Sequence, residues 1–230
     1  MPEMPNEQPE TDAKRYLTAV VRQELLQYLE LQKEALNRIT ALLSAAEWIR
    51  NRGPSNALAG PSLDEQEILR AAVVLTHAYL EDFVRTIARN LLPHAGAKAL
   101  DKVPVKLGTF VRLRNDVDKI VVESVSAYLN RRPFSGREEI KNLFKMVSVN
   151  LSPIQEGYLN VLDEMSQRRH RIVHAGDRVV SPGAETIFRP ITHAEVLKWL
   201  KNTHDFMSSL SFGLLEAHLK NPQSHTSHPG

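Results

Sequence analysis

The stretch ILRAAVVLTHAYLEDFVRTIARNLL, residues 68–92, decides the fold class, because its apolar side chains occupy nearly every side of a helix. Upstream, Ser62 precedes Glu65 by three residues, which is the spacing of a capping box at the start of a helix. A helix that is apolar nearly all round is stable only when other elements surround it. We therefore predict a helix over residues 62–92 that lies at the centre of its domain.

Helix signals recur along the rest of the chain, and strand signals are scarce. Residues 13–50 repeat apolar side chains at helical spacing until the sequence NRGP at 51–54 ends the pattern. Cap residues, prolines and glycines predict further helices over residues 115–132, from 135, over 152–175 and over 192–220. Residues 176–190 are either a small hairpin or a loop. The predicted fold class is an all-α helical bundle with an extra long N-terminal helix.

The two ends of the chain differ from its middle in composition. Both ends are polar and rich in proline, which is typical of disordered segments. We therefore divide the chain into a disordered start at 1–11, an N-terminal helix and loop at 12–60, a helical bundle at 61–220 and a disordered tail at 221–230.

The composition of the 230 residues excludes several classes of protein. The chain is 42% hydrophobic and 24% charged, as in ordinary globular domains, and it has no cysteine for a disulfide or a thiolate site. No apolar run reaches the roughly 18 residues of a membrane span, and the start lacks the order of a signal peptide. We therefore expect a cytoplasmic protein without a membrane partner.

Charge is unevenly distributed along a chain whose formal net charge is only +2. Residues 102–145 carry 10 basic and 5 acidic side chains, net +5, and can hold an anionic partner, although a solvated face is the more common interpretation of such a stretch. Aromatic residues make up 6% and do not alternate with the basic ones, so no base-stacking platform is visible. No Gly-rich phosphate loop, serine nucleophile elbow or paired-acid signature occurs.

The chemistry-bearing segment is MSQRRHRIVHAGD, residues 165–177. On an ideal helix Arg169 falls on an apolar stripe, and Arg168 flanks it; the stripe comprises Ile154, Tyr158, Leu162, Met165 and Ile172. A buried guanidinium without a partner is costly, so Arg169 must meet an acid, an anion or a wet groove. Arginine is also the side chain best suited to bidentate phosphate contacts.

Two histidines of this segment, His170 and His174, share the opposite helix face with Asp163. An imidazole can pass protons at a reacting oxygen near neutral pH. The two also have a metal-ligand spacing, but no acid or cysteine of a known zinc motif accompanies them, so proton transfer is favoured over metal binding. A structural interpretation also stands, because cations in a last helical turn complement the helix dipole.

Arg169 and His174 lie about 140° apart on an ideal helix, so they cannot reach one ligand from one straight helix. Either the last turn unwinds before Gly176, or a second copy of the helix supplies the missing group across a twofold axis.

A second polar line crosses the central helix, where His77, Glu81 and Arg85 follow one another at four-residue spacing beside Asp82. This line is either a solvent-facing stripe with a Glu81–Arg85 pair, or Glu81 or Asp82 orients the arginines of the other long helix.

The run RHRIVH at 169–174, followed by Ala-Gly-Asp177, resembles the Arg-polar-x-x-x-His motif of HEPN domains. Residues 68–84 are similar to the early helix of the RiboL-PSP-HEPN branch, in which an acid commonly falls where Glu81 falls, and the helix from Thr192 matches the one that usually follows the motif. The resemblance covers roughly residues 60–220. The N-terminal part lies largely outside it and is interpreted as a dimer or regulatory element.

The resemblance implies an α-helical bundle that dimerises and places two motifs in one groove. Many such domains are metal-independent endoribonucleases of toxin–antitoxin or antiviral systems, and some only bind RNA or a partner. Arg169 would then bind the scissile phosphate and His174 would be the general acid–base. His170 stands where the family more often has Asn or Asp, so it is either a motif-orienting group or a second acid–base.

The remaining candidates complete the hypothesis. Glu81, Asp82 and Arg168 are expected to support the site, and the candidate RNA-phosphate contacts are Arg171, Arg131 and Arg132. RNA supplies its own nucleophile, the 2′-hydroxyl, so Arg and His suffice without a metal or cofactor, and the expected products are a 2′,3′-cyclic phosphate and a 5′-hydroxyl. Expected partners are RNA, a second copy of the chain and an antitoxin or defence-system protein. The alternative function is a non-catalytic helical module that binds RNA, a nucleotide or a partner protein.

Overall fold

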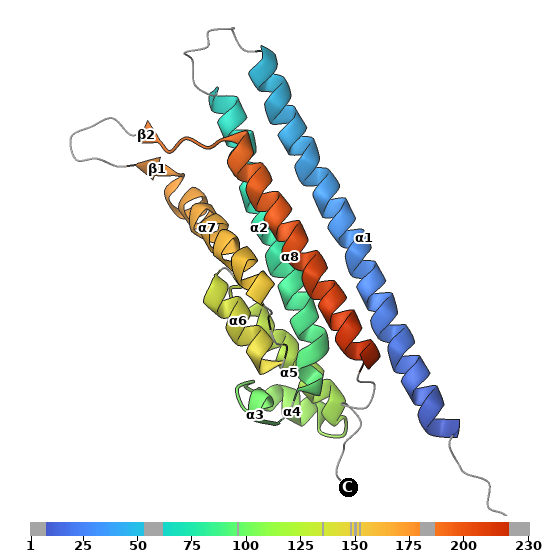
Figure 1. Ribbon diagram of the computed structural model, residues 1–230. Helices are drawn as coiled ribbons and strands as arrows, with labels where there is room; N and C mark the ends of the chain where they lie inside the picture. The colour runs from blue at the N-terminus through green and yellow to red at the C-terminus, as the bar shows by residue number, and fades with distance from the viewer. Residues whose placement is uncertain are drawn as a thin grey trace, which may run out of the picture.

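The computed structural model describes residues 8–52, 62–95, 97–134, 136–147, 149, 151, 153–179 and 187–220. The elements, labelled in Figure 1, are α1 (Gln8–Arg52), α2 (Leu63–Leu91), the 3₁₀ turn η1 (Leu92–His94), α3 (Ala97–Leu100), α4 (Leu107–Leu113), α5 (Val117–Asn130), α6 (Arg137–Met146), α7 (Pro153–Ala175), β1 (Arg178–Val179), β2 (Ile187–Phe188) and α8 (His193–Lys220). The predicted all-α class is confirmed, with one short two-stranded ladder in addition.

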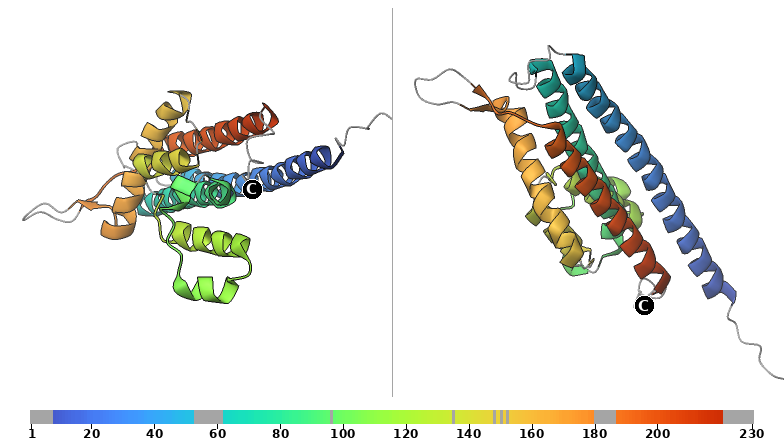
Figure 2. Two further views of the ribbon diagram at one scale, coloured as in Figure 1. Left: turned by 90° about the horizontal axis from the view of Figure 1, so that it is seen from below. Right: turned by 45° about the horizontal axis from the view of Figure 1, so that its top comes forward.

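The four long helices run side by side, and the short ones gather at one end (Figures 1 and 2). Helices α2 and α8 lie between α1 on one side and α7 on the other, and α2 contacts α1, α5, α7 and α8. The prediction that α2 is central is confirmed, because Leu69, Val73, Leu80 and Val84 are fully buried. Helix α2 therefore connects the α1 side of the bundle with the α7 side.

Local cap signals account for the helix boundaries that were predicted. The Glu65 backbone N–H donates to Ser62 Oγ at 3.2 Å at the start of α2. At the start of α8, the Glu195 N–H donates to Thr192 Oγ1 at 3.2 Å, and the Thr192 N–H donates to the Glu195 carboxylate at 2.8 Å. Helix α7 ends at Ala175, and Gly176 adopts a φ of +57°. This left-handed conformation explains why a glycine stands at that position.

Other boundaries differ from the predictions. Helix α1 begins at Gln8, so residues 8–11 are helical rather than part of a disordered start. Asp116 is the N-cap of α5 and accepts from the Lys119 N–H at 3.0 Å. The predicted cap residues Ser135 and Ser152, and the two outer segments 1–7 and 221–230, lie outside the described residues.

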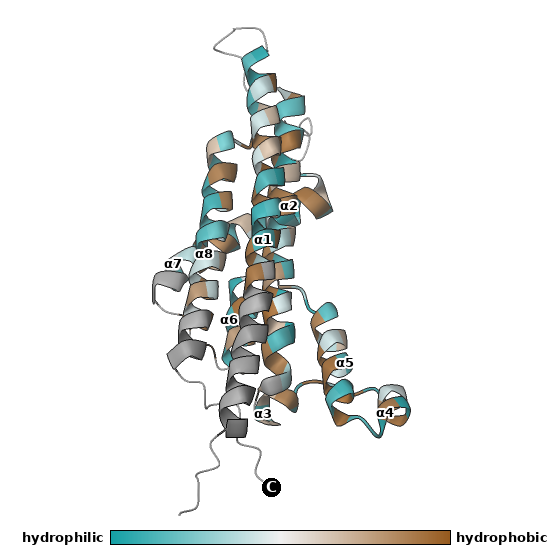
Figure 3. Cartoon of the chain, turned by 90° about the vertical axis from the view of Figure 1, so that its right-hand side faces the viewer, coloured by the Kyte–Doolittle hydropathy of each residue, from teal (hydrophilic) through white to brown (hydrophobic). Residues whose placement is uncertain are grey.

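Helix α4 was not predicted, and with α5 it projects from one side of the bundle (Figure 3). Its N-cap, Lys106, makes no side-chain cap hydrogen bond, so no local start signal exists. Several large apolar side chains of α4 and its flanks are exposed: Val105, Leu107, Phe110 and Val111.

The segment after α7 is a hairpin, which decides between the two interpretations of residues 176–190. Strands β1 and β2 pair antiparallel, with Arg178 opposite Phe188 and Val179 opposite Ile187. No helix in the described part of the chain is long and apolar enough to span a membrane.

Candidate active site on helix α7

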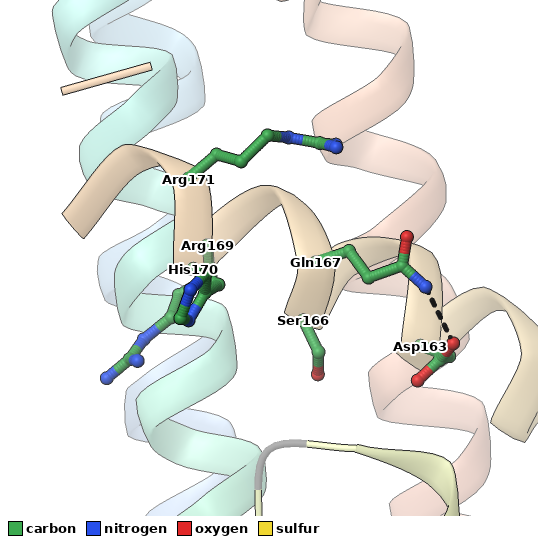
Figure 4. Close-up of a pocket in the computed structure, with 6 residues that line it drawn as sticks. All are labelled: Asp163, Ser166, Gln167, Arg169, His170 and Arg171. Carbon is green, nitrogen blue, oxygen red and sulfur yellow. Dashed lines mark hydrogen bonds between the residues drawn. The ribbon is translucent and has the colours of Figure 1, made fainter. Parts of the chain in front are cut away.

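An open pocket of about 380 Å³ lies along the middle of α7 and is lined by Asp163, Ser166, Gln167, Arg169, His170 and Arg171. Arg169 is half-buried, whereas His170 and Arg171 are exposed. In the view of Figure 4 the Arg169 and His170 side chains overlap, while Arg171 leaves α7 in a different direction. Arg169 and His170 therefore line the same pocket of a single chain.

His174 does not line this pocket itself, but its ring packs against the ring of His170, which does. The rings of His170 and His174 are tilted by 43° with their centroids 4.5 Å apart, and both side chains are exposed. Helix α7 stays regular to Ala175, so the last turn does not unwind before Gly176. The structure therefore does not show the unwound last turn that would unite Arg169 with His174 within one chain.

Contacts beneath the pocket hold α7 against its neighbours. His77 Nε2 of α2 lies 3.0 Å from Ser166 Oγ, and both side chains are buried. On the same face, the Asp163 carboxylate accepts from Gln167 Nε2 at 2.9 Å and from the Arg137 backbone N–H at 3.5 Å. The polar line on α2 is therefore not wholly solvent-facing, because His77 bonds inward to α7.

A buried ion-pair cluster lies at the C-terminal end of α7. Asp177 Oδ2 accepts from Arg168 Nη2 at 2.6 Å and from Arg70 Nε of α2 at 3.1 Å. All three side chains are at most 6% exposed. Both arginines also donate to the Arg189 carbonyl, at 2.9 Å from Arg168 and 3.0 Å from Arg70. We call Arg70, Arg168 and Asp177 the arginine–aspartate clamp.

The clamp joins α2, the end of α7 and the segment before α8. Asp177 has a φ of 57°, its N–H donates to the Arg171 carbonyl at 3.0 Å, and its own carbonyl accepts from the Arg189 N–H at 2.9 Å. Burial lowers the pKa of Arg168 below its ordinary value, and Asp177 opposes that shift. An arginine nevertheless keeps its proton in a protein, so the clamp contains two cations and one anion.

Arg168 was expected to flank the apolar stripe and to support the site, and the structure shows it buried in the clamp instead. The buried guanidinium of α7 belongs to Arg168, and its partner is an acid of the same chain rather than a phosphate. Sequence reasoning missed Arg70, and it noted Asp177 beside the motif without assigning it a role. The available signal was Asp177 itself, an acid directly after the glycine that ends an arginine-rich helix.

The acids of α2 do not orient the arginines of α7 through any hydrogen bond or ion pair between described residues. Asp82 lines a separate pocket together with residues of α1 and α8. Arg85 does not pair with Glu81; it donates to the carbonyls of Leu129 and Arg132, each at 3.5 Å. The structure thus shows neither the Glu81–Arg85 pair nor a bond from these acids to α7, whereas Asp82 is exposed, as a solvent-facing stripe predicts.

Arg131 and Arg132 are exposed directly after α5, and the Arg132 guanidinium lies 4.8 Å from the centroid of the Tyr128 ring. They precede the loop whose far end, at Arg137, contacts Asp163 of the pocket. Among the described residues, no group of three or more His, Asp or Glu side chains is arranged to hold a metal ion.

The family model of RiboL-PSP-HEPN matches residues 34–211, so the chain belongs to this HEPN family. HEPN domains are commonly ribonucleases, and they often bind RNA and dimerise. The match begins within α1, earlier than the resemblance over residues 60–220 predicted. Comparisons with curated proteins and with solved structures find no significant match.

Proposed function

We propose that the protein is a metal-independent endoribonuclease that cleaves RNA through attack by the 2′-hydroxyl. One observation carries this proposal: Arg169 and His170 line one open pocket, with His174 packed against His170, in the residue order of the HEPN motif. A cation beside imidazoles supplies what this reaction needs, namely charge stabilisation at the phosphate and proton transfer.

In the proposed reaction, Arg169 binds the scissile phosphate and a histidine accepts the 2′-hydroxyl proton as O2′ forms its bond to phosphorus. The bond to the 5′ oxygen then breaks, and that oxygen takes a proton from a general acid. Attacking and leaving oxygens lie on opposite sides of phosphorus in an in-line displacement. The adjacent rings of His170 and His174 lie on one side of α7, so we assign the second proton-transfer group to another subunit.

The proposed homodimer therefore places its twofold axis beside the exposed face of α7. Val173, Arg171 and His174 are exposed on the last two turns and are available for such a contact. An interface built on α1 would leave the two motifs apart, because α2 and α8 separate α1 from α7 (Figure 1). This geometry favours α7 over the N-terminal helix α1 as the source of the dimer contact.

The biological role that we propose is a toxin or antiviral-defence effector in the cytoplasm, controlled by an antitoxin or defence-system protein. Family membership supports this role, since HEPN domains are commonly ribonucleases.

The test is cleavage of total RNA by the purified full chain in EDTA. We expect Arg169→Ala and His174→Ala each to abolish cleavage while the helical circular dichroism is unchanged. The matched controls are Arg114→Ala and His204→Ala, which remove exposed side chains away from the pocket and should cleave normally. Full activity of His174→Ala would refute the mechanism, and RNA binding without cleavage by the wild type would favour the non-catalytic module.

The composite site has its own test. Excess His174→Ala subunits, mixed into wild type under conditions of subunit exchange, should depress activity more than dilution does. A monomer in sedimentation that still cleaves at full specific activity would refute the shared site.

A further inference from the structure

His170 and His174 lie one turn apart near the C-terminal end of α7, and they are the only two histidines of the sequence with four-residue spacing. Both side chains are exposed. Apart from their contact with each other, neither imidazole makes a hydrogen bond or an ion pair with another described residue. Their ring nitrogens are therefore available to a ligand from solvent, on one face of the helix.

The separation of the two rings fits a single metal ion held between them. A metal ion binds an imidazole nitrogen at about 2.0–2.1 Å, which places the ion about 3.2 Å from the ring centroid. Two rings bound at right angles then have centroids about 4.5 Å apart, and two rings bound at the tetrahedral angle have centroids about 5.2 Å apart. The observed separation is 4.5 Å. The pair therefore matches two adjacent positions of a square-planar or octahedral ion.

This geometry and the type of ligand restrict the ion. Nitrogen ligands at right angles are typical of Ni²⁺ and Cu²⁺, whereas Zn²⁺ prefers tetrahedral sites. Mg²⁺ and Ca²⁺ prefer oxygen ligands. The chemical class is therefore a divalent transition-metal ion that binds imidazole, with water in its remaining positions.

Two charges near the pair act on such an ion in opposite directions. The C-terminal end of a helix carries a partial negative charge, which attracts a cation to the last turns of α7. Arg169 lines the same pocket as His170, and its charge repels a cation. With two protein ligands rather than the four of a structural zinc site, we expect a dissociation constant on the order of 10 μM. The clamp anchors the last turn of α7, so the pair needs no backbone rearrangement to bind.

We propose that His170 and His174 chelate a divalent transition-metal ion of the Ni²⁺ or Cu²⁺ type, and that the bound ion switches the α7 site off. A neutral imidazole has one nitrogen lone pair, and an imidazole whose lone pair binds a metal cannot accept a proton. The metal site stands on the geometry of the pair alone. The inhibition rests in addition on the proposed function, in which a histidine accepts the 2′-hydroxyl proton.

The first experiment titrates NiCl₂ into the full chain, without an affinity tag, by calorimetry. We expect one Ni²⁺ per chain, or one per two chains where two pairs share an ion. His174→Ala and His170→Asn each remove one ligand and should weaken binding at least about 10-fold.

Two matched controls remove other histidines. His204→Ala deletes an exposed histidine of α8, and a double variant, His225→Ala with His228→Ala, deletes the closely spaced pair of the C-terminal tail. Both should bind Ni²⁺ as the wild type does. Absence of Ni²⁺ binding, or binding that survives both His174→Ala and His170→Asn, would overturn the metal site.

The second experiment follows RNA cleavage with increasing Ni²⁺. We expect inhibition over the concentration range in which calorimetry detects binding, full recovery on addition of EDTA, and no inhibition by the same concentrations of Mg²⁺. The cleavage that His170→Asn retains should need at least about 10-fold more Ni²⁺ for half-inhibition, because one ligand is missing.

The two experiments separate this inference from the proposed function. A wild type that binds Ni²⁺ through the pair but cleaves no RNA would refute the ribonuclease and the inhibition with it, and would leave the metal site standing. Cleavage that continues at full rate with Ni²⁺ bound would overturn the switch and leave the ribonuclease standing.

Discussion

Arg168 and Arg169 are consecutive residues of one helix, yet the structure uses them in different ways. Arg168 is buried and bonded to Asp177, and Arg169 is half-buried in an open pocket beside His170. A rotation of about 100° per residue places them on different faces of α7, and the surroundings of each face decide its role. One face fixes the helix end, and the other presents its side chains to a ligand.

The two faces depend on each other. The clamp ties the last turn of α7 to α2 and to the segment before α8, so the exposed histidines project from an anchored backbone. A site that must hold a phosphate and transfer protons needs such a rigid support. We therefore expect clamp variants to change stability first and pocket variants to change activity alone.

The largest effect on stability is expected from Asp177→Ala. The change leaves Arg70 and Arg168 buried without their shared acid, and breaking such a buried pair destabilises by about 3–5 kcal/mol. Urea denaturation followed by circular dichroism measures it. Glu67→Ala removes the largely exposed partner of Arg70 and should cost less than about 1 kcal/mol. Equal losses for the two variants would show that the clamp is not a buried cluster.

The next effect separates the two neighbouring arginines. Arg169→Ala should reduce the cleavage rate by about 10²–10³-fold, because a charge that stabilises the transition state is lost, with little change in the denaturation midpoint. Arg168→Ala should lower stability by roughly 1–3 kcal/mol, since buried acceptors lose their donor. Initial cleavage rates and thermal melting curves of both variants measure these two effects. If Arg168→Ala were stable but inactive while Arg169→Ala remained active, then Arg168 would be the catalytic arginine and Arg169 the structural one.

A smaller effect is expected at His170, where the family more often has Asn or Asp. If His170 mainly orients His174, then His170→Asn keeps a polar group there and should retain cleavage within about 10-fold, well short of the 10²–10⁴-fold typical of an acid–base group. The rate constant of cleavage under single-turnover conditions measures this. A loss as large as that of His174→Ala would instead make His170 a second proton-transfer residue.

The smallest effect is expected at the end of α7. Gly176→Ala introduces no clash, since the nearest atom would be Arg178 Nε at 3.5 Å, but alanine disfavours a φ of +57°, which costs about 1 kcal/mol. Gly157→Ala, in the open first half of the same helix, should stabilise by roughly 0.5–1 kcal/mol. If the thermal midpoint shifted in the same direction in both variants, the left-handed conformation of Gly176 would not be what ends α7.

Features encoded by neighbouring residues were predictable from the sequence. The caps at Ser62 and Thr192, the stop at Gly176 and the central position of α2 all follow from patterns within a few residues or within one helix. The Arg169–His170–His174 segment was found for the same reason, because its members lie on one helix.

Features made by distant parts of the chain were not predictable. Arg70 meets Asp177 across 107 residues, and His77 meets Ser166 across 89, so no local pattern marks either contact. The apolar stripe of an ideal helix predicted that Arg169 is the buried arginine. In the structure Arg168 is the buried one, because Asp177, which follows Gly176, forms an ion pair with it. Helix α4 has no side-chain cap, and its large apolar residues are exposed. The sequence therefore contained neither a capping residue nor a buried apolar face from which this helix could be predicted.

The most direct test of the proposed chemistry compares two oligoribonucleotides in EDTA. One is all-ribo, and the other carries a single 2′-deoxy nucleotide at the cleaved position. We predict that the wild type cuts the first into fragments with a 2′,3′-cyclic phosphate and a 5′-hydroxyl and leaves the second intact, because the 2′-hydroxyl is the nucleophile. Cleavage of the deoxy-substituted strand at that position, or cleavage only after a divalent metal is added, would contradict catalysis by Arg169 and His174 alone.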